Sequence, residues 1–213
     1  MTIDAGLAAH TRLCAALLLT LGFWAPGRTQ PFTALFDGTL AGWTLENTAA
    51  ANVELRHGLL HVKQAPGWLK SANRYADFLL RVEFRFLSED ADSGIFVRAV
   101  ADSNFGPGWP SNAYQVQLRN PIGESPFPPV GGLFRHGLPA GDTAFDAADA
   151  ARLSLGTGVW QTLEIEARGE SLTVWLNGER LTRATGIVNS SGYIGIQAET
   201  GELEFRAIEI ATF

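Results

Sequence analysis

Two glutamines on alternate positions, Gln115 and Gln117, carry the clearest recognition chemistry in this sequence. They belong to segment 114–118, in which apolar and polar residues alternate. As a strand, this segment places Tyr114, Val116 and Leu118 on one face and both glutamines on the other. Amide groups donate and accept hydrogen bonds at once, which suits a ligand rich in hydroxyl groups. The alternative is that the glutamines line the solvated outer face of an antiparallel sheet.

Two tryptophans are candidates for stacking on a sugar ring. Trp109 lies in segment 101–112, which is rich in turn-forming residues and is predicted to be an irregular loop. Long loops in compact domains are often functional, although Trp109 could equally cap the core. Trp68, which follows Gly67, is the second candidate. A further irregular stretch with four prolines is predicted over 120–130.

The elements that must position these residues are strands. Segment 79–87 alternates apolar side chains with Arg81, Glu83 and Arg85, which indicates a solvated sheet face carrying opposite charges. His57-Gly58 and Asn177-Gly178 are hairpin signals. Segment 138–152 could include a short helical turn. Short antiparallel strands at fairly regular spacing predict an all-β fold, either a two-sheet sandwich or a jelly roll.

The composition narrows the function classes. Among 213 residues, 18% are charged and the net charge is −6. A chain of this length suits one domain of the larger all-β kind. The absence of a basic footprint disfavours a nucleic acid or an anionic membrane as partner. His57 and His61 are separated by a turn and lack a third ligand, so they are weak evidence for a metal site.

Residues 1–27 are predicted to be a secretory signal peptide. Arg12 precedes an apolar run over 13–25 that is too short for a membrane-spanning helix. Cys14, the only cysteine, lies in this run, so the mature chain over 28–213 would contain neither a thiol nor a disulfide. We therefore expect a secreted or periplasmic protein that has no membrane association after signal cleavage.

Seven motifs in order resemble the 3-keto-disaccharide hydrolase domain family, long called a domain of unknown function. Together they cover about residues 32–213. The motifs are Leu35-Phe36-Asp37-Gly38 with Gly42-Trp43, Tyr75-Ala76-Asp77-Phe78, Asp92-Ser93-Gly94-Ile95-Phe96-Val97-Arg98, Tyr114-Gln115-Val116-Gln117, Gly131-Gly132-Leu133-Phe134-Arg135, Trp160 with Val174-Trp175-Leu176-Asn177-Gly178, and Gly195-Ile196-Gln197 with Glu199 and Glu204-Phe205-Arg206.

The resemblance implies a concanavalin A-like jelly roll with its ligand groove on the concave sheet. It also implies cleavage of glycosides whose sugar carries a keto group at C3, and a functional link to a sugar 3-dehydrogenase. Two positions depart from the family pattern. Gln115 stands where the family often has Glu, and Glu199 where it often has His. The site is therefore rearranged, altered in substrate, or reduced to binding.

The implied chemistry assigns roles to individual residues. A carbonyl at C3 acidifies the C2 proton, so the site needs a base, donors for the developing enolate oxygen, and an acid for the leaving group. We expect Glu199 or His136 to be the base or acid, with Arg98 and Arg135 stabilising the oxyanion. The alternatives are that Arg98 forms an outer salt bridge and that His136 is a surface loop histidine. Ring hydroxyls would bind Gln115, Gln117 and Gln197, with Gly195 leaving room for the ligand. A divalent metal could polarise the keto oxygen, although no ligand cluster is visible in the sequence.

Three other functions are considered. A retaining glucanase of this fold would carry Glu-x-Asp-x-x-Glu on one strand, which is absent here, so that class is rejected. A carbohydrate-binding module without turnover would need only the glutamines and aromatic residues such as Trp68 and Trp109. A structural sandwich for protein contacts would need a flat apolar face, which the glutamines and arginines disfavour.

Overall fold

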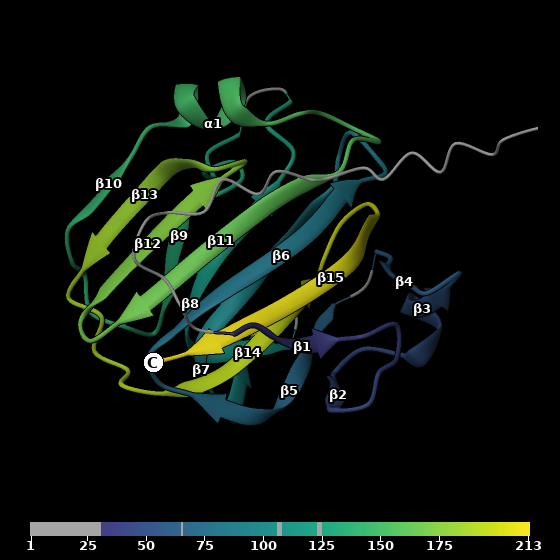
Figure 1. Cartoon of the computed structure of the whole chain (residues 1–213), viewed down its shortest axis with the longest axis horizontal. Helices are drawn as coiled ribbons and strands as arrows, with labels where there is room; N and C mark the ends of the chain where they lie inside the picture. Colours follow the sequence, from purple (N-terminus) through teal and green to yellow (C-terminus); the bar gives the residue numbers. More distant parts are fainter. Residues whose placement is uncertain (1–30, 65, 106–107, 123–124) are drawn as a thin grey trace, which may run out of the picture.

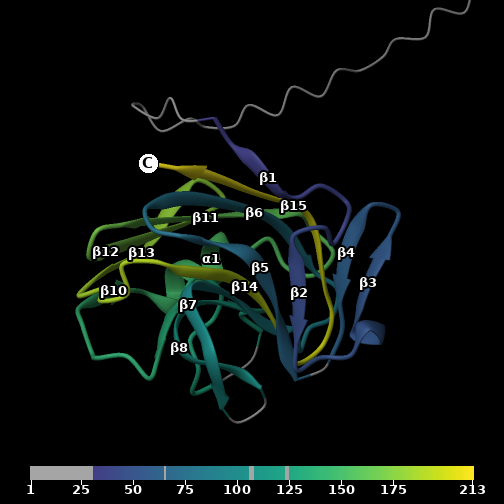
Figure 2. The same ribbon diagram turned by 90° about the horizontal axis from the view of Figure 1, so that it is seen from below.

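The computed structural model describes residues 31–213 except 65, 106–107 and 123–124. The predicted signal peptide and Cys14 lie outside the described residues. Two antiparallel sheets dominate the fold, and Figure 2 shows β6, β11 and β15 in one layer with β14, β7 and β8 in the other. The prediction of a two-sheet all-β sandwich is therefore confirmed. Within the described residues, no helix is long and apolar enough to span a membrane.

The larger sheet forms one layer of the sandwich (Figure 1). Its main path runs in the order β10-β13-β12-β11-β6-β15-β4-β3, and β1 pairs with β15. The strands are β1 (Thr33–Phe36), β3 (Val53–Arg56), β4 (Leu59–Val62), β6 (Phe78–Phe86), β10 (Thr143–Phe145), β11 (Gln161–Arg168), β12 (Ser171–Leu176), β13 (Glu179–Thr185) and β15 (Leu203–Thr212).

The smaller sheet carries the glutamine strand. Its order is β2-β5-β14-β7-β8-β9. The strands are β2 (Trp43–Glu46), β5 (Gly67–Tyr75), β7 (Asp92–Phe105), β8 (Trp109–Arg119), β9 (Leu133–His136) and β14 (Gly192–Ala198). The remaining elements are the 3-10 helix η1 (Ala50–Asn52) and the helix α1 (Ala147–Leu153), which confirms the helical turn predicted within 138–152.

Alternating side chains create the core between the sheets. On β6, Leu80, Val82, Phe84 and Phe86 are fully buried, and burial of each such side chain stabilises the fold by about 1.5–3 kcal/mol. The charged residues of the same strand face outward, where Arg81 pairs with Glu164, Arg85 with Glu204 and Glu83 with Arg206. The predicted solvated face of opposite charges is confirmed.

One long hairpin replaces a predicted loop. Strand β7 continues to Phe105 and β8 begins at Trp109, with register shifts between Val97 and Val100 and again before Asn104. The prediction of an irregular loop over 101–112 is therefore wrong, because bulges let turn-forming residues stay paired in a twisted hairpin. The second irregular prediction holds, since the described part of 120–130 contains no strand.

Candidate functional site

The two glutamines of β8 are buried, not solvated. Their apolar neighbours Tyr114, Val116 and Leu118 face the core, as predicted from the alternation. Gln115 and Gln117 point to the other face, where they are only 2% and 3% exposed. Their burial excludes the alternative of a solvated outer face. Buried amide groups require hydrogen-bond partners within the protein.

Those partners form a network across four strands, β7, β8, β9 and β14. Gln115 Nε2 donates to Gln117 Oε1 at 2.6 Å and to Gln197 Oε1 at 2.8 Å. Gln117 Nε2 donates to Asp92 Oδ1 at 2.6 Å. His136 Nε2 lies 2.7 Å from Gln115 Oε1, an acceptor, so this nitrogen carries the proton. The donors therefore point along the network from His136 towards the Asp92 carboxylate.

A glycine makes room for this network. Gly94 on β7 lies directly opposite Gln117, and a Cβ atom at Gly94 would stand 2.5 Å from Gln115 Nε2. Real Cβ contacts essentially never come this close. The glycine of the Ser93-Gly94 motif therefore lets the Gln115 side chain lie across β7 towards Gln197.

Two carboxyl groups, Asp92 and Glu199, meet at one end of the network. Burial raises the pKa of Asp92 to about 6, although nearby Arg119 and the hydrogen bond from Gln117 act in the opposite direction. Burial, together with the negative charge of Asp92, raises the pKa of Glu199 to about 7. Like charges in a desolvated site disfavour double ionisation. Near neutral pH, Glu199 therefore exchanges a proton readily.

His136 closes the other end of the network. Burial lowers the pKa of His136, so the imidazole is neutral at pH 7. Its ring packs against Phe96 and Phe134, with centroid separations of 5.9 and 6.0 Å. The neutral ring holds Gln115 in place and contributes one wall of the site.

These groups surround a cavity of about 120 Å³. Its lining combines hydrogen-bonding side chains with aromatic rings. The lining residues are Asp92, Trp109, Gln115, Gln117, Phe127, Phe134, His136, Gln197 and Glu199. Polar groups converging in a partly aromatic pocket are typical of a small-molecule binding site.

Six of the residues predicted from the sequence are brought together here: Gln115, Gln117, Gln197, Trp109, His136 and Glu199. Trp109 is half-buried, and its indole Nε1 donates to the carbonyl oxygen of Ala198 at 3.3 Å. It therefore forms a fixed wall of the cavity, consistent with the proposed stacking role.

Arg98 lies elsewhere, and the expectation that it stabilises an oxyanion is corrected. Its backbone has a φ of +49° at the bulge in β7, which removes it from the strand alternation. The side chain is 1% exposed and donates to the carbonyl oxygens of Ala76, Gly169 and Asn189 and to Asp77 Oδ1, each at 2.8 Å. Arg98 therefore ties three connecting segments together.

Arg135 also does not reach the cavity. It neighbours His136 on β9 and points to the opposite face of the sheet. There its guanidinium donates to the carbonyl oxygens of Thr185 and Gly186 and lies over the core-facing ring of Tyr114. The expected oxyanion role of Arg135 is therefore also corrected.

The structure contradicts the expectations that Trp68 stacks on a sugar ring and that Gly195 leaves room for a ligand. Trp68 is fully buried and packs edge-on against Phe96. A Cβ atom at Gly195 would stand 2.4 Å from the Trp68 ring. The space left by Gly195 is therefore filled by Trp68, not by a ligand, and Trp68 packs beside the site, opposite Gln197 on the neighbouring strand.

Three lining residues were not predicted as site residues: Asp92, Phe127 and Phe134. A signal for Asp92 was present, because it shares the strand parity of Gly94 and Phe96. Phe127 lies in the proline-rich stretch, where no periodicity applies. Across the described residues, no group of three His, Cys, Asp or Glu side chains is placed to hold a metal ion, so the possible divalent metal finds no fitting ligand set there.

The comparisons with known proteins agree with this architecture. The profile of the 3-keto-alpha-glucoside-1,2-lyase-like domain matches residues 31–211. Among curated protein sequences, none is similar enough to match.

Solved structures show the same fold at low sequence identity. Two candidate glycosyl hydrolases from Parabacteroides distasonis ATCC 8503 are 17% and 14% identical, with TM-scores of 0.67 and 0.66. The alignments cover 86% of this chain and 100% of the first protein, and 85% and 94% for the second. The carbohydrate-binding module CBM66 from Bacillus subtilis is 12% identical with a TM-score of 0.54, covering 80% of this chain and 96% of the module. The expected jelly-roll fold is confirmed.

Proposed function

This chain belongs to the 3-keto-alpha-glucoside-1,2-lyase-like domain family, and from that premise we propose that it cleaves the glycosidic bond of 3-keto-glycosides. The family is one of carbohydrate-active proteins; the choice of a 3-keto substrate and the mechanism below are our proposal. One observation carries it: a carboxyl group with a pKa near 7, Glu199, lies in a cavity lined by hydrogen-bonding amides.

Glu199 is the proposed base. An ionised carboxylate with a raised pKa is a stronger base than an ordinary one and is still available at neutral pH. When Glu199 takes a proton, its repulsion from the ionised Asp92 disappears. Asp92 thus favours proton transfer to Glu199 without contacting the proton itself.

The proposed reaction is an elimination followed by a hydration. Glu199 removes the C2 proton, and the C2–H electron pair forms a C2–C3 double bond, which leaves an enolate oxygen at C3. The C3 carbonyl then re-forms, a C1–C2 double bond forms and the C1–O bond breaks. The leaving oxygen departs as an alcohol after taking a proton from the carboxyl group of Glu199. Addition of water across C1–C2 then gives the free 3-keto sugar.

The amides supply binding and charge stabilisation. Gln197 Oε1 accepts from Gln115, and no hydrogen bond within the described part of the chain uses Gln197 Nε2. Gln197 Nε2 is therefore the proposed donor to the enolate oxygen at C3, in place of the arginines expected from the sequence. The network from His136 to Asp92 fixes the orientation of these amides before the substrate arrives.

The substrate also implies a cellular context. A keto group at C3 must be made by oxidation of a glycoside, so we propose that the protein acts after a sugar 3-dehydrogenase. We further propose export to the periplasm or the medium, on the basis of the apolar run that follows Arg12.

A second candidate function is carbohydrate binding without turnover. Gln115 favours it, because a neutral amide stands where the family often has a titratable Glu. Under this alternative, Glu199→Gln would leave the affinity for a glycan unchanged and no substrate would be cleaved.

The two functions separate in one assay. The protein is incubated with a 3-keto-disaccharide, with and without a chelator, and released sugar and 3-keto-glucose are quantified. Release of these sugars supports the proposed cleavage of 3-keto-glycosides. Release that is unchanged by the chelator supports a mechanism that uses no metal ion. A saturable change in tryptophan fluorescence without release supports the binding module.

A further inference from the structure

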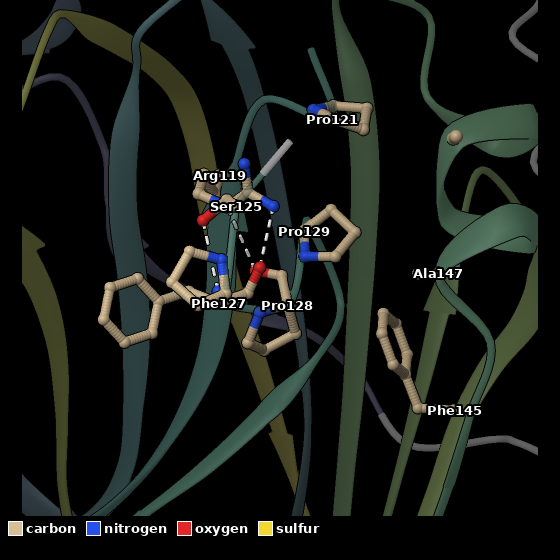
Figure 3. A pocket seen from close by; sticks show the side chains of 10 residues that line it. Arg119, Pro121, Ser125, Phe127, Pro128, Pro129, Phe145 and Ala147 are labelled. Atoms are coloured by element: carbon tan, nitrogen blue, oxygen red, sulfur yellow. Dashed lines mark hydrogen bonds between the residues drawn. The ribbon is translucent and has the colours of Figure 1, made fainter. Parts of the chain in front are cut away.

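A second hollow lies beside the cavity, between the proline-rich stretch and α1. It is open to solvent and has a volume of about 860 Å³. Figure 3 shows the prolines on one side of it and Phe145 with Ala147 on the other. The lining residues are Arg119, Pro121, Ser125, Pro126, Phe127, Pro128, Pro129, Phe145, Ala147 and Ala151.

Among the described residues that line this hollow, most side chains are apolar and stiff. Four of them are prolines, and the two polar side chains, Arg119 and Ser125, hold the proline-rich stretch itself. Arg119 donates to the carbonyl oxygens of Phe127 and Pro128, and Ser125 Oγ accepts from the Phe127 amide (Figure 3). These side chains therefore offer few hydrogen-bond partners to a ligand covered with hydroxyl groups, whereas they can pack against a flat apolar ring, whose removal from water is favourable.

Phe127 connects the hollow to the catalytic cavity. It lines both spaces and is 56% exposed although its side chain is large and apolar. Its ring contacts Phe134 of the cavity wall, with a centroid separation of 6.0 Å. In addition, Arg119 of the hollow lies directly opposite Asp92 in the β7–β8 register. A ligand could therefore extend from one space into the other past the Phe127 ring.

The volumes of the two spaces indicate that each one holds a different part of the substrate. A cavity of about 120 Å³ is below the usual range for ligand sites, about 300–1,000 Å³. It therefore accommodates the reacting part of a glycoside, and the remainder must lie outside it. The adjoining hollow is large enough for that remainder.

We propose that this hollow binds the leaving group of the substrate, and that the leaving group is an aromatic alcohol, not a second sugar. This inference rests on the proposed function, because a leaving group exists only if a glycoside is cleaved. Phe127 and Phe145 provide aromatic faces and the prolines provide rigid apolar walls, which together favour a planar phenolic ring.

The test compares substrates with different leaving groups, and it compares the parent protein with a variant in which a tryptophan fills the hollow. Ala151 is exposed on α1 and lines the hollow, so Ala151→Trp would occupy it. Ala148 is exposed on the same helix outside the lining, so Ala148→Trp is the matched control. With purified full chain, KM is measured for phenyl and methyl 3-keto-glucosides of the same anomer and for a 3-keto-disaccharide. Binding of free 4-nitrophenol is measured by calorimetry.

We expect the phenyl glycoside to have a KM at least 10-fold below that of the methyl glycoside. Ala151→Trp should abolish this preference and weaken 4-nitrophenol binding at least 5-fold, while Ala148→Trp changes neither. Equal KM values for phenyl and methyl substrates would overturn the inference and leave the proposed function standing. A KM lowest for the disaccharide and raised by Ala151→Trp would assign the hollow to a second sugar and also overturn it.

The remaining outcome separates the two proposals in the other direction. Binding of 4-nitrophenol that is sensitive to Ala151→Trp, together with no cleavage of any 3-keto-glycoside, would support an aromatic site and contradict the proposed function. Thermal unfolding of both tryptophan variants shows whether either substitution disturbs the fold.

Discussion

Asp92 and Thr200 bond to each other's backbone: the Asp92 amide donates to the Thr200 carbonyl oxygen at 2.9 Å, and the Thr200 amide donates back at 3.1 Å. This bridge continues the pairing of β14 with β7 beyond the end of β14. It fixes Glu199, the residue before Thr200, at the same cavity as the Asp92 side chain. The paired carboxyl groups on which the proposed mechanism depends are therefore set by backbone pairing.

Replacing Asp92 should change the pH dependence of cleavage. As the base, Glu199 must be ionised, so kcat/KM rises with pH through about 7. Asp92→Asn removes the negative charge that helps to raise the pKa of Glu199. The rising limb should then move to lower pH by about one unit, the size typical of a neighbouring like charge. A limb that stays in place or moves upward would contradict the coupling.

Glu199 should also make stability depend on pH. Its pKa is about 7 in the folded protein against 4.5 in the unfolded chain, so the folded state binds the proton more tightly. The resulting stabilisation is complete below pH 4.5 and is lost as pH rises through 7. Glu199→Gln removes this loss.

The Tm of Glu199→Gln relative to the parent should therefore be higher at pH 8 than at pH 5. Because Glu199 is partly exposed, we expect a difference of about 1–2 kcal/mol, or several degrees. Thermal unfolding at the two pH values checks this, with exposed Glu170→Gln as control. An equal Tm difference at both pH values would mean that Glu199 has an ordinary pKa.

Arg98 should act on stability, not on chemistry. Arg98→Ala leaves the carbonyl oxygens of Ala76, Gly169 and Asn189 without their donor, and loss of a buried charged donor costs about 3–5 kcal/mol. Chemical denaturation should show this cost. The activity of the molecules that remain folded should stay within a few-fold of the parent, and a selective loss of kcat in folded protein would restore the oxyanion role.

Gly195 should be intolerant of a side chain because of Trp68. The Cβ atom of Gly195→Ala would stand 2.4 Å from the ring of Trp68, and such overpacking costs about 1–3 kcal/mol. We expect reduced stability and a changed tryptophan emission spectrum. Unchanged stability with weaker glycan binding would instead indicate that Gly195 leaves room for a ligand.

The alternation of β8 was sufficient to predict the amide face of the site. Tyr114, Val116 and Leu118 alternate with Gln115 and Gln117 without a bulge, so parity along the strand holds. Parity failed two residues beyond Phe96, because the bulge at Arg98 redirects its side chain. The sequence does not reveal that Arg98 adopts a positive φ, because this backbone conformation depends on the contacts that hold the arginine in the folded protein.

Contacts between distant segments limited the rest of the prediction. The space at Gly195 on β14 is filled by Trp68 from the neighbouring strand β5. The residue pattern of a strand does not reveal which neighbouring side chain occupies such a space. The placement of Phe127 depends on the path of the proline-rich stretch, which has no period. The raised pKa of Glu199 likewise follows from burial and from Asp92, two features that exist only after folding.

Turnover of a 3-keto-disaccharide by the parent protein and by Glu199→Gln, with Glu170→Gln as the matched control, tests the role of Glu199 as the base. We predict release of 3-keto-glucose by the parent and the control, and a loss of about 10²–10⁴-fold in Glu199→Gln while that variant stays folded. Undiminished release by folded Glu199→Gln would contradict the assignment of Glu199 as the base.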